Sequence, residues 1–500
     1  MISPAPTVPQ ELPMPNDRLE AWLITLVLTV LAAITRFTMV QSPTDASTPV
    51  FDEKHYAPQA WQVLQNGGIE DNPGYGLVVH PPFGKQLMAI GEAIFGYSGL
   101  GWRFSAAACG TILVLLVIRI VRRLARSTMI GAFAGVLMIC DGLMFVSSRI
   151  GMLDIFLAVL VVAALGCLVV DRDDVRARMA KVYAEGRIED SPWGPRLGIR
   201  WWRFGAGVLL GLACATKWSG LYFVAFFGVM CVVMDYLARR AYRVQRPLIG
   251  TALRDAIPAL YALVAVPIVA YLLTYAPWFA SEFGVGRYVV GTKIGTDGPY
   301  AWLPDGLRSL WYYSGNVLKF HEELTNSAGN RHPWESKPWT WPMGLRPMLY
   351  YFSEGSKTCT ESGCIRAVMA VGTPAIWWLA LPAYFWGVWR WLVKRDWRYG
   401  IAVVGYSAAL LPWFTVLDRQ MYYFYAVAMA PFMCMFMALA MGEIVGRARN
   451  GEERRKTGLL AVSIYLGIVV ANFIWLYPIL TAMPISPATW NSELWLPSWR

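Results

Sequence analysis

The sequence Phe51-Asp52-Glu53-Lys54-His55-Tyr56 follows the first long apolar run of the chain and carries two adjacent carboxylates beside a histidine. The apolar run before it, residues 21–40, is long enough to cross a bilayer, so this polar stretch lies at a membrane edge. Charged side chains beside hydrocarbon are costly, and in membrane proteins they usually mark functional sites. We therefore interpret the rest of the chain as a frame that holds Asp52 and Glu53 at the bilayer surface.

The composition indicates a membrane protein that crosses the bilayer many times. The 500 residues are 56% hydrophobic, and the mean hydropathy is +0.41, which is more apolar than soluble domains usually are. The formal net charge is +11, but the Lys and Arg residues fall mostly in short links between apolar runs. This distribution is typical of cytoplasmic loops, and it argues against a nucleic-acid partner.

The apolar runs predict an all-α fold with about eleven transmembrane helices in one membrane domain, residues 1–500. The expected spans are residues 21–40, 100–120, 130–146, 152–170, two within 204–237, 257–279, 367–389, 399–417, 421–441 and 458–477. Two polar regions interrupt this pattern, a first loop over residues 41–99 and a larger loop over residues 281–365. In the first loop, His55–Gln65 and Gln86–Phe95 have the apolar spacing of helices that lie on a membrane surface.

The distribution of basic residues also predicts the orientation. The basic links after the even-numbered spans share one side with the N-terminus, and that side is expected to be the cytoplasm. The first apolar run lacks the features of a cleaved signal peptide and is expected to be a retained anchor. The first loop, the large loop and the C-terminus then lie outside the cytoplasm, and the expected location is the plasma membrane.

The adjacent acids are expected to have different roles. Side chains of consecutive residues point in different directions, so Asp52 and Glu53 are not expected to share a proton. One could act as a general base, because a carboxylate near apolar surface has a raised proton affinity. The other could bind substrate or hold the fold. The alternative is that either residue is only a helix N-cap or a solvated loop acid.

Four cations lie at or within apolar runs on the same side: Arg36, Arg103, Arg149 and Lys217. Together they could hold a phosphate, Arg through its planar fork and Lys as a point charge. At this depth the phosphate would belong to a lipid, and as a leaving group it would be stabilised by these cations. The alternative is that each side chain reaches toward lipid headgroups.

The histidines and aromatic residues of the two loops are further candidates for substrate binding. His55 lies beside the acids, and His80 precedes a double proline that fixes a turn. A metal site built from the acids and these histidines is not favoured, because no ligand spacing typical of one is present. In the large loop, His332 and Trp339 belong to an aromatic segment suited to a sugar or a peptide, although such a segment could simply pack on the membrane.

Cys359 and Cys364 differ from the other six cysteines, which lie within apolar runs. They flank the polar segment Thr360–Gly363 in a loop placed outside the cytoplasm. That compartment is oxidising, so a local disulfide is expected.

An ordered set of motifs resembles the protein O-mannosyltransferase family. These motifs are Phe51-Asp52-Glu53, His80-Pro81-Pro82 with Gly84-Lys85, Arg103-Phe104-Ser105, Arg149-Ile150-Gly151-Met152-Leu153-Asp154, Lys217-Trp218-Ser219-Gly220 and His332-Pro333-Trp334-Glu335-Ser336-Lys337-Pro338-Trp339. They keep their order and spacing over nearly the whole chain. The loop at residues 281–365 is too short for the β-trefoil domain of eukaryotic members, so the resemblance is to the bacterial branch.

The resemblance implies a GT-C membrane glycosyltransferase that moves mannose from a polyprenyl phosphate carrier to Ser or Thr of secreted proteins, with inversion. It implies Asp52 as base, Glu53 in substrate placement, and Arg103 and Lys217 at the lipid phosphate. It implies no metal or other cofactor. The expected partners are the lipid donor, membrane lipids, and acceptor proteins met at the translocation machinery.

Two other functions remain open at the level of sequence. Another GT-C enzyme could use the same donor class with a lipid or cell-wall glycan acceptor. A lipid transporter would need ionisable residues at mid-bilayer and repeat symmetry. The clustering of ionisable residues at one face favours an enzyme.

Overall fold

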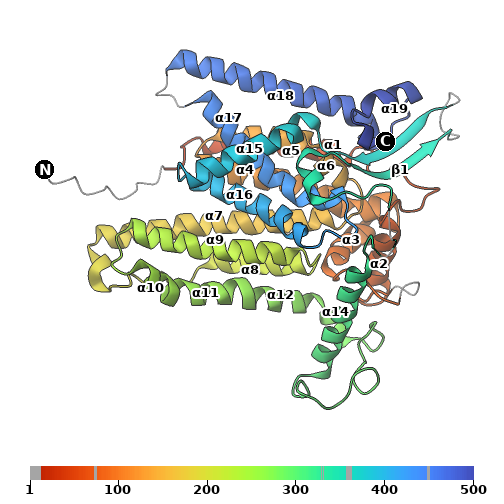
Figure 1. Cartoon of the computed structure of the whole chain (residues 1–500), viewed down its shortest axis with the longest axis horizontal. Helices are drawn as coiled ribbons and strands as arrows, with labels where there is room; N and C mark the ends of the chain where they lie inside the picture. The colour runs from red at the N-terminus through yellow and green to blue at the C-terminus, as the bar shows by residue number, and fades with distance from the viewer. Residues whose placement is uncertain (1–12, 72–75, 328, 330–331, 356–362, 447–450) are drawn as a thin grey trace.

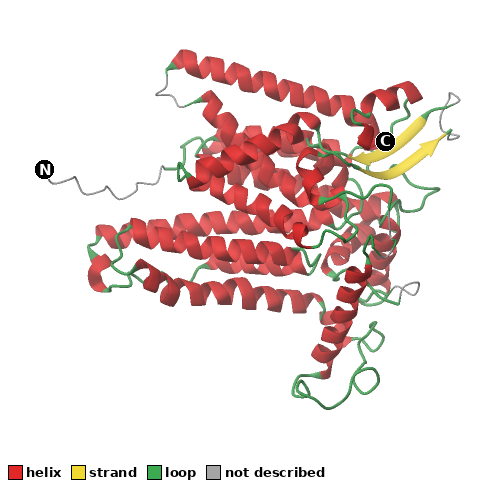
Figure 2. Ribbon diagram, in the orientation of Figure 1, coloured by secondary structure: helices red, strands yellow, loops and turns green. Residues whose placement is uncertain are grey.

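The computed structural model shows a helical bundle with one β-hairpin at its end (Figures 1 and 2). It describes residues 13–71, 76–327, 329, 332–355, 363–446 and 451–500. The spanning helices lie roughly parallel, and the loops of both large polar regions gather at the same end of the bundle (Figure 1). This end carries the functional site.

The first half of the chain supplies nine helices of six or more residues among the described segments. They are α1 (Arg18–Phe37), α2 (Glu53–Gln65), α3 (Phe83–Phe95), α4 (Gly99–Ala125), α5 (Thr128–Cys140), α6 (Gly142–Ser147), α7 (Asp154–Ala184), α8 (Trp201–Cys214) and α9 (Gly220–Ala241). Side-chain caps fix several of their beginnings: the Ser98 hydroxyl accepts from the backbone N–H of Gly101 at the start of α4.

The second half begins with one continuous helical stretch, Pro247–Thr274, which contains α10 (Pro247–Thr251), α11 (Ile257–Leu260) and α12 (Val266–Thr274) with π-helical turns between them. The remaining elements are α13 (Ala276–Ala280), α14 (Asp305–Glu323), β1 (Met348–Glu354), β2 (Ile365–Ala370), α15 (Pro374–Leu392), α16 (Trp397–Leu410), α17 (Ala430–Val445), α18 (Glu452–Thr481) and α19 (Pro487–Glu493). Short 3₁₀ segments at Leu411–Thr415 and Tyr423–Met429 join α16 to α17.

Seven of the described helical stretches are long and apolar enough to cross a membrane, and α5 and α8 are shorter apolar helices. The number of about eleven crossings therefore stays a prediction. The positions of most expected spans match helices, including the break between α8 and α9. The expected span over 130–146 is divided at Asp141, whose carboxylate caps α6 by accepting from the Met144 N–H at 2.8 Å.

The expected span over 367–389 was wrong at its beginning. Residues 365–370 form β2, which pairs antiparallel with β1 from Met348↔Ala370 to Glu354↔Ile365, and the helix α15 begins only at Pro374. The fold is therefore mainly helical with a hairpin in the large loop. Cys364, just before β2, is disulfide-bonded, and its predicted partner Cys359 lies outside the described residues.

The two helices predicted in the first loop are confirmed as helices, and their position on the membrane surface stays a prediction. The predicted helix at His55–Gln65 is α2, which begins two residues earlier and ends at Asn66 as its C-cap. The second predicted helix is α3. Because α2 begins at Glu53, the carboxylate pair stands at the first turn of this helix, with Asp52 at the N-cap position.

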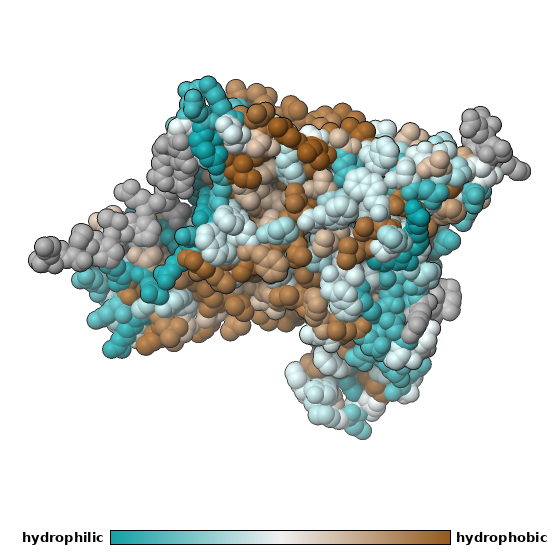
Figure 3. Space-filling model, turned by 45° about the horizontal axis from the view of Figure 1, so that its top comes forward, coloured by the Kyte–Doolittle hydropathy of each residue, from teal (hydrophilic) through white to brown (hydrophobic). Residues whose placement is uncertain are grey.

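Burial separates the inner helices from those that face lipid. In α7 and in the stretch Tyr423–Val445, 78% and 89% of the most apolar window is buried, against 17% in α1 and 28% in α18. The outer helices therefore expose their apolar side chains, and Figure 3 shows a broad hydrophobic band between polar ends. Such a band is the expected surface of a protein embedded in a bilayer.

Candidate active site

Glu53 is fully buried and is bound to Arg103 at both carboxylate oxygens. Arg103 donates from Nε to Oε1 at 2.6 Å and from Nη2 to Oε2 at 2.7 Å. The backbone N–H groups of Gly151 and Val50 also donate to Glu53, at 2.6 and 3.1 Å. Glu53 therefore ties the first loop to α4 and to the link before α7, and its lone pairs are occupied inside the protein.

Arg103 was expected to hold a lipid phosphate, but its contacts argue against this. Besides Glu53, its guanidinium donates to the carbonyl of Val40 at 3.0 Å and to that of Pro43 at 2.8 Å. The side chain is completely buried. A guanidinium with a paired carboxylate and two carbonyls around it has no free face for a phosphate, so Arg103 is a structural partner of Glu53.

Arg149 and Arg36 are likewise engaged by backbone carbonyls. Arg149 Nη1 donates to the carbonyls of Thr35, Arg36 and Thr38, at 3.0, 2.9 and 2.6 Å, and so caps the end of α1. Arg36 is fully buried and donates from Nη2 to the Met138 carbonyl at 3.0 Å. Neither side chain lines the cavity that contains Lys217 and Asp154. The structure therefore does not bring these two cations to the expected phosphate site.

Asp52 lies in a different environment from its neighbour Glu53. Burial raises the pKa of its carboxyl to about 6, although the charges of Lys217 and His55 act in the opposite direction. The nearby carboxylate of Asp154 raises this pKa further. Asp52 is therefore close to Lys217 and Asp154, and near neutral pH it is an ionised carboxylate with increased basicity.

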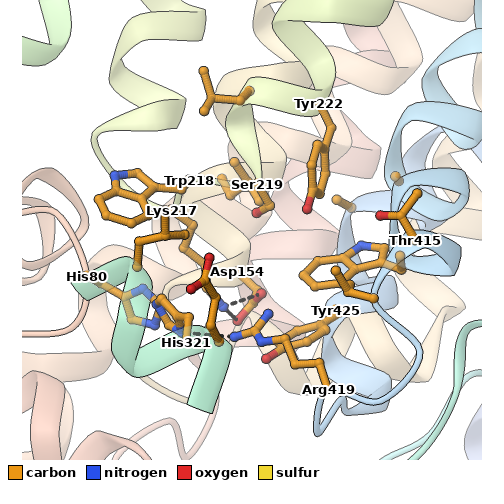
Figure 4. Close-up of a pocket in the computed structure, with 18 of the residues that line it drawn as sticks. His80, Asp154, Lys217, Trp218, Ser219, Tyr222, His321, Thr415, Arg419 and Tyr425 are labelled. Atoms are coloured by element: carbon orange, nitrogen blue, oxygen red, sulfur yellow. Dashed lines mark hydrogen bonds and ion pairs between the residues drawn. The ribbon is translucent and has the colours of Figure 1, made fainter. Parts of the chain in front are cut away.

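A cavity of about 590 Å³ is lined by Asp154 and Lys217, whereas Asp52 is not one of its lining residues and is linked to it through the charges of these two side chains. Its wall is formed by the α8–α9 break, the end of α14 and the segment that joins α16 to α17 (Figure 4). The polar residues of the wall are His80, Asp154, Lys217, Ser219, Tyr222, His321, Glu322, Thr325, Thr415, Asp418, Arg419 and Tyr425. Residues from five distant parts of the sequence thus share one space.

Lys217 is held in this wall by Asp154. Its Nζ lies 2.9 Å from Oδ1 and 3.1 Å from Oδ2 of that carboxylate, and the side chain is almost buried. Lys217 lies in the break between α8 and α9, where the chain packs so closely that a Cβ on Gly220 would lie 2.7 Å from the backbone N of Cys214. Of the four cations expected from the sequence, Lys217 is the one that lines the cavity.

Arg419 is a second cation of the cavity, and it was not predicted from the sequence. Its Nη2 lies 2.9 Å from Nδ1 of His321, while its Nε is buried without a hydrogen-bond partner among the described residues. It lies on a short link between two apolar runs, where a single charged residue carries little signal. The one available hint was that this link falls on the same predicted side as Asp52.

Two histidines form part of the cavity, with their rings 5.7 Å apart. Burial lowers the pKa of His80 well below its usual value, and burial together with Arg419 lowers that of His321 to about 4. Both imidazoles are therefore neutral near pH 7. His80 also contacts the ring of Tyr56 on α2 at 5.9 Å, whereas His55 is exposed on the same helix.

The two predicted residues of the large loop lie outside the cavity wall. The Nδ1 of His332 accepts from the backbone N–H of Trp334 at 3.1 Å, and its ring meets that of Tyr422 at 5.3 Å. Trp339 is 56% exposed. Across the described ranges, no group of three or more His, Cys, Asp and Glu side chains is arranged to hold a metal ion.

The fold is similar to that of membrane glycosyltransferases with known structures. The chain superposes on the Saccharomyces cerevisiae protein O-mannosyltransferase Pmt1-Pmt2 complex bound to the sugar donor with a TM-score of 0.72 and 14% identity, covering 96% of this chain and 93% of that one. The archaeal oligosaccharyltransferase AglB from Archaeoglobus fulgidus gives a TM-score of 0.52 and 12% identity, over 96% of this chain and 58% of that one. These similarities show the GT-C fold, which is the fold of these membrane glycosyltransferases.

Sequence relatives identify the family within this class. Residues 98–282 match the family described as dolichyl-phosphate-mannose-protein mannosyltransferase, and residues 307–499 match the C-terminal four TMM region of protein-O-mannosyltransferase. A polyprenol-phosphate-mannose–protein mannosyltransferase of Mycolicibacterium smegmatis is 59% identical over 100% of this chain and 97% of its own length. The Corynebacterium glutamicum protein of that name is 44% identical over 95% and 92%. The chain belongs to the protein O-mannosyltransferase family.

Proposed function

We propose that this chain transfers mannose from a polyprenyl phosphate carrier to Ser or Thr hydroxyls of secreted proteins, with Asp52 as the general base. The observation that carries this proposal is the cavity itself. Two cations, Lys217 and Arg419, lie in its wall, and the charge of Lys217 acts on the carboxylate of Asp52, whose basicity is raised by burial. A base and cations close to one another are what a displacement at a sugar phosphate needs.

In the proposed reaction the acceptor hydroxyl oxygen attacks the anomeric carbon of mannose. The hydroxyl proton passes to the carboxylate of Asp52, and the bond between the anomeric carbon and the phosphate oxygen breaks. The electron pair of that bond leaves with the carrier phosphate, so the configuration at the anomeric carbon inverts. The pKa of about 6 at Asp52 supports this role, because the group is ionised near pH 7 and more basic than an exposed aspartate.

The leaving phosphate would be held by Lys217 and Arg419. Lys217 lies in the cavity wall with Asp154 as its partner, and Arg419 has a buried Nε that lacks an acceptor among the described residues. These two cations stabilise the charge that develops on the phosphate, so no general acid is required. The ammonium nitrogen of Lys217 lies 5.2 Å from the centre of the Tyr425 ring.

Glu53 would support catalysis indirectly. Its four hydrogen bonds to Arg103, Gly151 and Val50 fix the first turn of α2. Asp52 is adjacent in that turn, so Glu53 is a positioning residue for the base. This assignment replaces the expectation that Glu53 touches a substrate.

An apolar rim offers a path for the polyprenyl chain. Leu221 of α9 and Leu318 of α14 line the cavity and are 57% and 50% exposed. Val416 and Leu417, which also line the cavity, are 39% and 41% exposed. A carrier embedded in the bilayer could therefore leave its isoprenoid tail in lipid while its phosphate enters the cavity.

The proposed location is the plasma membrane, with the N-terminus in the cytoplasm and the cavity outside. The basic links between spans support this orientation. Acceptor proteins would then be met as unfolded chains at the translocation machinery. Residues of the large loop, including His332 and Trp339, stay candidates for contacts with the acceptor.

We also propose that the reaction needs no metal ion, so activity should survive a strong chelator.

The direct test supplies radiolabelled polyprenyl phosphomannose to membranes that contain the unaltered chain or the variant Asp52→Asn. We expect label in protein, in an alkali-labile O-linked form, with the unaltered chain alone. Label in a lipid or a cell-wall glycan instead would overturn the acceptor assignment. Equal label with the variant would overturn the assignment of the base.

A further inference from the structure

The helix α14 differs in direction from the spanning helices. It runs across the end of the bundle, and its N-terminal half projects sideways beyond α12 (Figure 1). Its C-terminal end reaches the cavity, where Leu318, His321 and Glu322 form part of the wall. The helix thus lies at the level where the apolar band of the bundle ends.

One face of α14 is packed on the protein. Leu310, Tyr313 and Val317 form a small core with Val78, Tyr275 and Trp278. The Tyr313 hydroxyl donates to the Val78 carbonyl at 2.7 Å and accepts from its N–H at 3.0 Å. These contacts fix the rotation of the helix about its own axis.

A second apolar face is left uncovered among the described residues. Leu307, Trp311 and Leu318 are four and seven positions apart, so their side chains lie on one side of the helix. Trp311 is 83% exposed and Leu318 is 50% exposed, whereas Leu307 is half-buried. Two large apolar side chains are thus exposed on the same side of α14, two turns apart.

The third face of α14 is polar and exposed. It carries Asp305, Asn316, Lys319 and Glu323, and Lys319 pairs with Glu323 at 3.7 Å. The packed face of the helix is therefore flanked on one side by polar side chains and on the other by the uncovered apolar stripe. This division matches a helix that lies at the boundary between water and hydrocarbon.

We propose that the stripe Leu307–Trp311–Leu318 docks on the lipid monolayer that borders the cavity. The apolar surface that precedes it supports lipid as the occupant: Ile268, Val269 and Leu273 of α12 are 54%, 57% and 67% exposed and lie at the end of a membrane-length helix. Tryptophan is favoured at this depth, because its ring suits the headgroup region. Phe283 and Trp302, in the loop before α14, are 88% and 77% exposed and would join the same interface.

Docking would couple the membrane to the cavity, and this consequence rests on the proposed function. Leu318 belongs both to the stripe and to the cavity wall, and His321, one turn further, contacts Arg419. A monolayer that holds α14 in place therefore also holds this side of the opening through which the carrier lipid would enter.

The test measures the depth of individual positions and does not depend on activity. The variants Trp311→Cys and Leu318→Cys would carry a nitroxide label in nanodiscs of phosphatidylcholine and phosphatidylglycerol. Asn316→Cys is the matched control on the polar face of the same helix. The unaltered chain, which has six free cysteines among its described residues, is treated in parallel to measure background labelling.

We expect positions 311 and 318 to be relaxed strongly by oxygen and weakly by a water-soluble nickel chelate, and position 316 to show the reverse. Strong relaxation by the nickel chelate at all three positions would overturn the proposal. Spin–spin broadening at 311 that disappears on dilution with unlabelled chain would also overturn it, because a second copy would then cover the stripe. Absence of mannosyl transfer by the unaltered chain, with the expected depths intact in the labelled variants, would contradict only the proposed function.

Discussion

Arg103 and Glu53 form a fully buried pair with both guanidinium–carboxylate distances below 2.8 Å. The pair joins α4 to the first turn of α2, so the adjacent residue Asp52 is fixed in position at the N-cap of this helix. Two neighbouring acids therefore have separate tasks: Glu53 holds the loop, and Asp52 remains near Lys217 with a pKa of about 6.

The variant Glu53→Gln should destabilise the fold. It leaves the buried charge of Arg103 without its counter-ion, and breaking such a pair costs about 3–5 kcal/mol. Thermal unfolding in detergent measures the effect as a lowered midpoint. The matched control is Glu452→Gln, because the side chain of Glu452 is 79% exposed and pairs only at the surface. An unfolding midpoint equal to that of the control would contradict the structural role of Glu53.

Arg419→Ala should weaken the use of the lipid donor. Losing a charged hydrogen bond to the phosphate costs about 1.5–3 kcal/mol, which corresponds to roughly a tenfold or larger rise in the donor KM. Arg419→Lys should recover part of this loss, since it keeps the charge but not the planar fork. The exposed Lys456→Ala serves as control. A rise confined to the KM of the acceptor peptide would rule out the phosphate assignment.

The contrast between Arg103 and Arg419 shows what the sequence could and could not predict. Charge at a membrane edge indicated that Arg103 matters, but a pattern cannot reveal that its partner lies 50 residues earlier at Glu53. Arg419 stands alone on a short link, and only tertiary packing brings it against His321. The positions of most helices followed from apolar length, because burial in lipid demands it.

Other differences arose where local chemistry overrides hydrophobicity. The run after residue 365 is apolar, yet its first residues form β2, because β1 offers them backbone partners along an antiparallel ladder with one irregularity between Leu349 and Tyr351. Within the run over 130–146, Asp141 caps a new helix and divides the span. Lys217 could be singled out from the sequence, because a cation within an apolar run is costly to bury and usually serves a functional site.

The rate of transfer should depend on pH through Asp52. The base must be ionised, and burial raises its pKa to about 6. Transfer at limiting donor and acceptor should therefore fall as the pH drops through about 6 and level off above 7. The measurement is kcat/KM over pH 5–8 in a detergent in which the fold is stable throughout. A flat profile across this range would contradict the role of Asp52 as base.

Lys217→Met should shift the acidic limb of the pH profile, which is the fall in transfer rate at low pH, to higher pH. The charge of Lys217 lowers the pKa of Asp52, so its removal makes the carboxyl harder to ionise. The same variant should raise the donor KM more than the acceptor KM, because a phosphate ligand is lost. Lys456→Met, which removes an exposed and distant charge, should leave the limb in place. A limb that moves to lower pH would contradict the proximity of these two residues.

The most direct measurement is single-turnover mannosyl transfer by Asp52→Asn, with donor binding measured on the same preparation. The substitution removes the proton acceptor and keeps the size of the side chain. We predict that donor affinity and unfolding midpoint remain close to those of the unaltered chain, while the rate of transfer falls by about 10²–10⁴. A transfer rate within a few-fold of the unaltered chain would contradict the account.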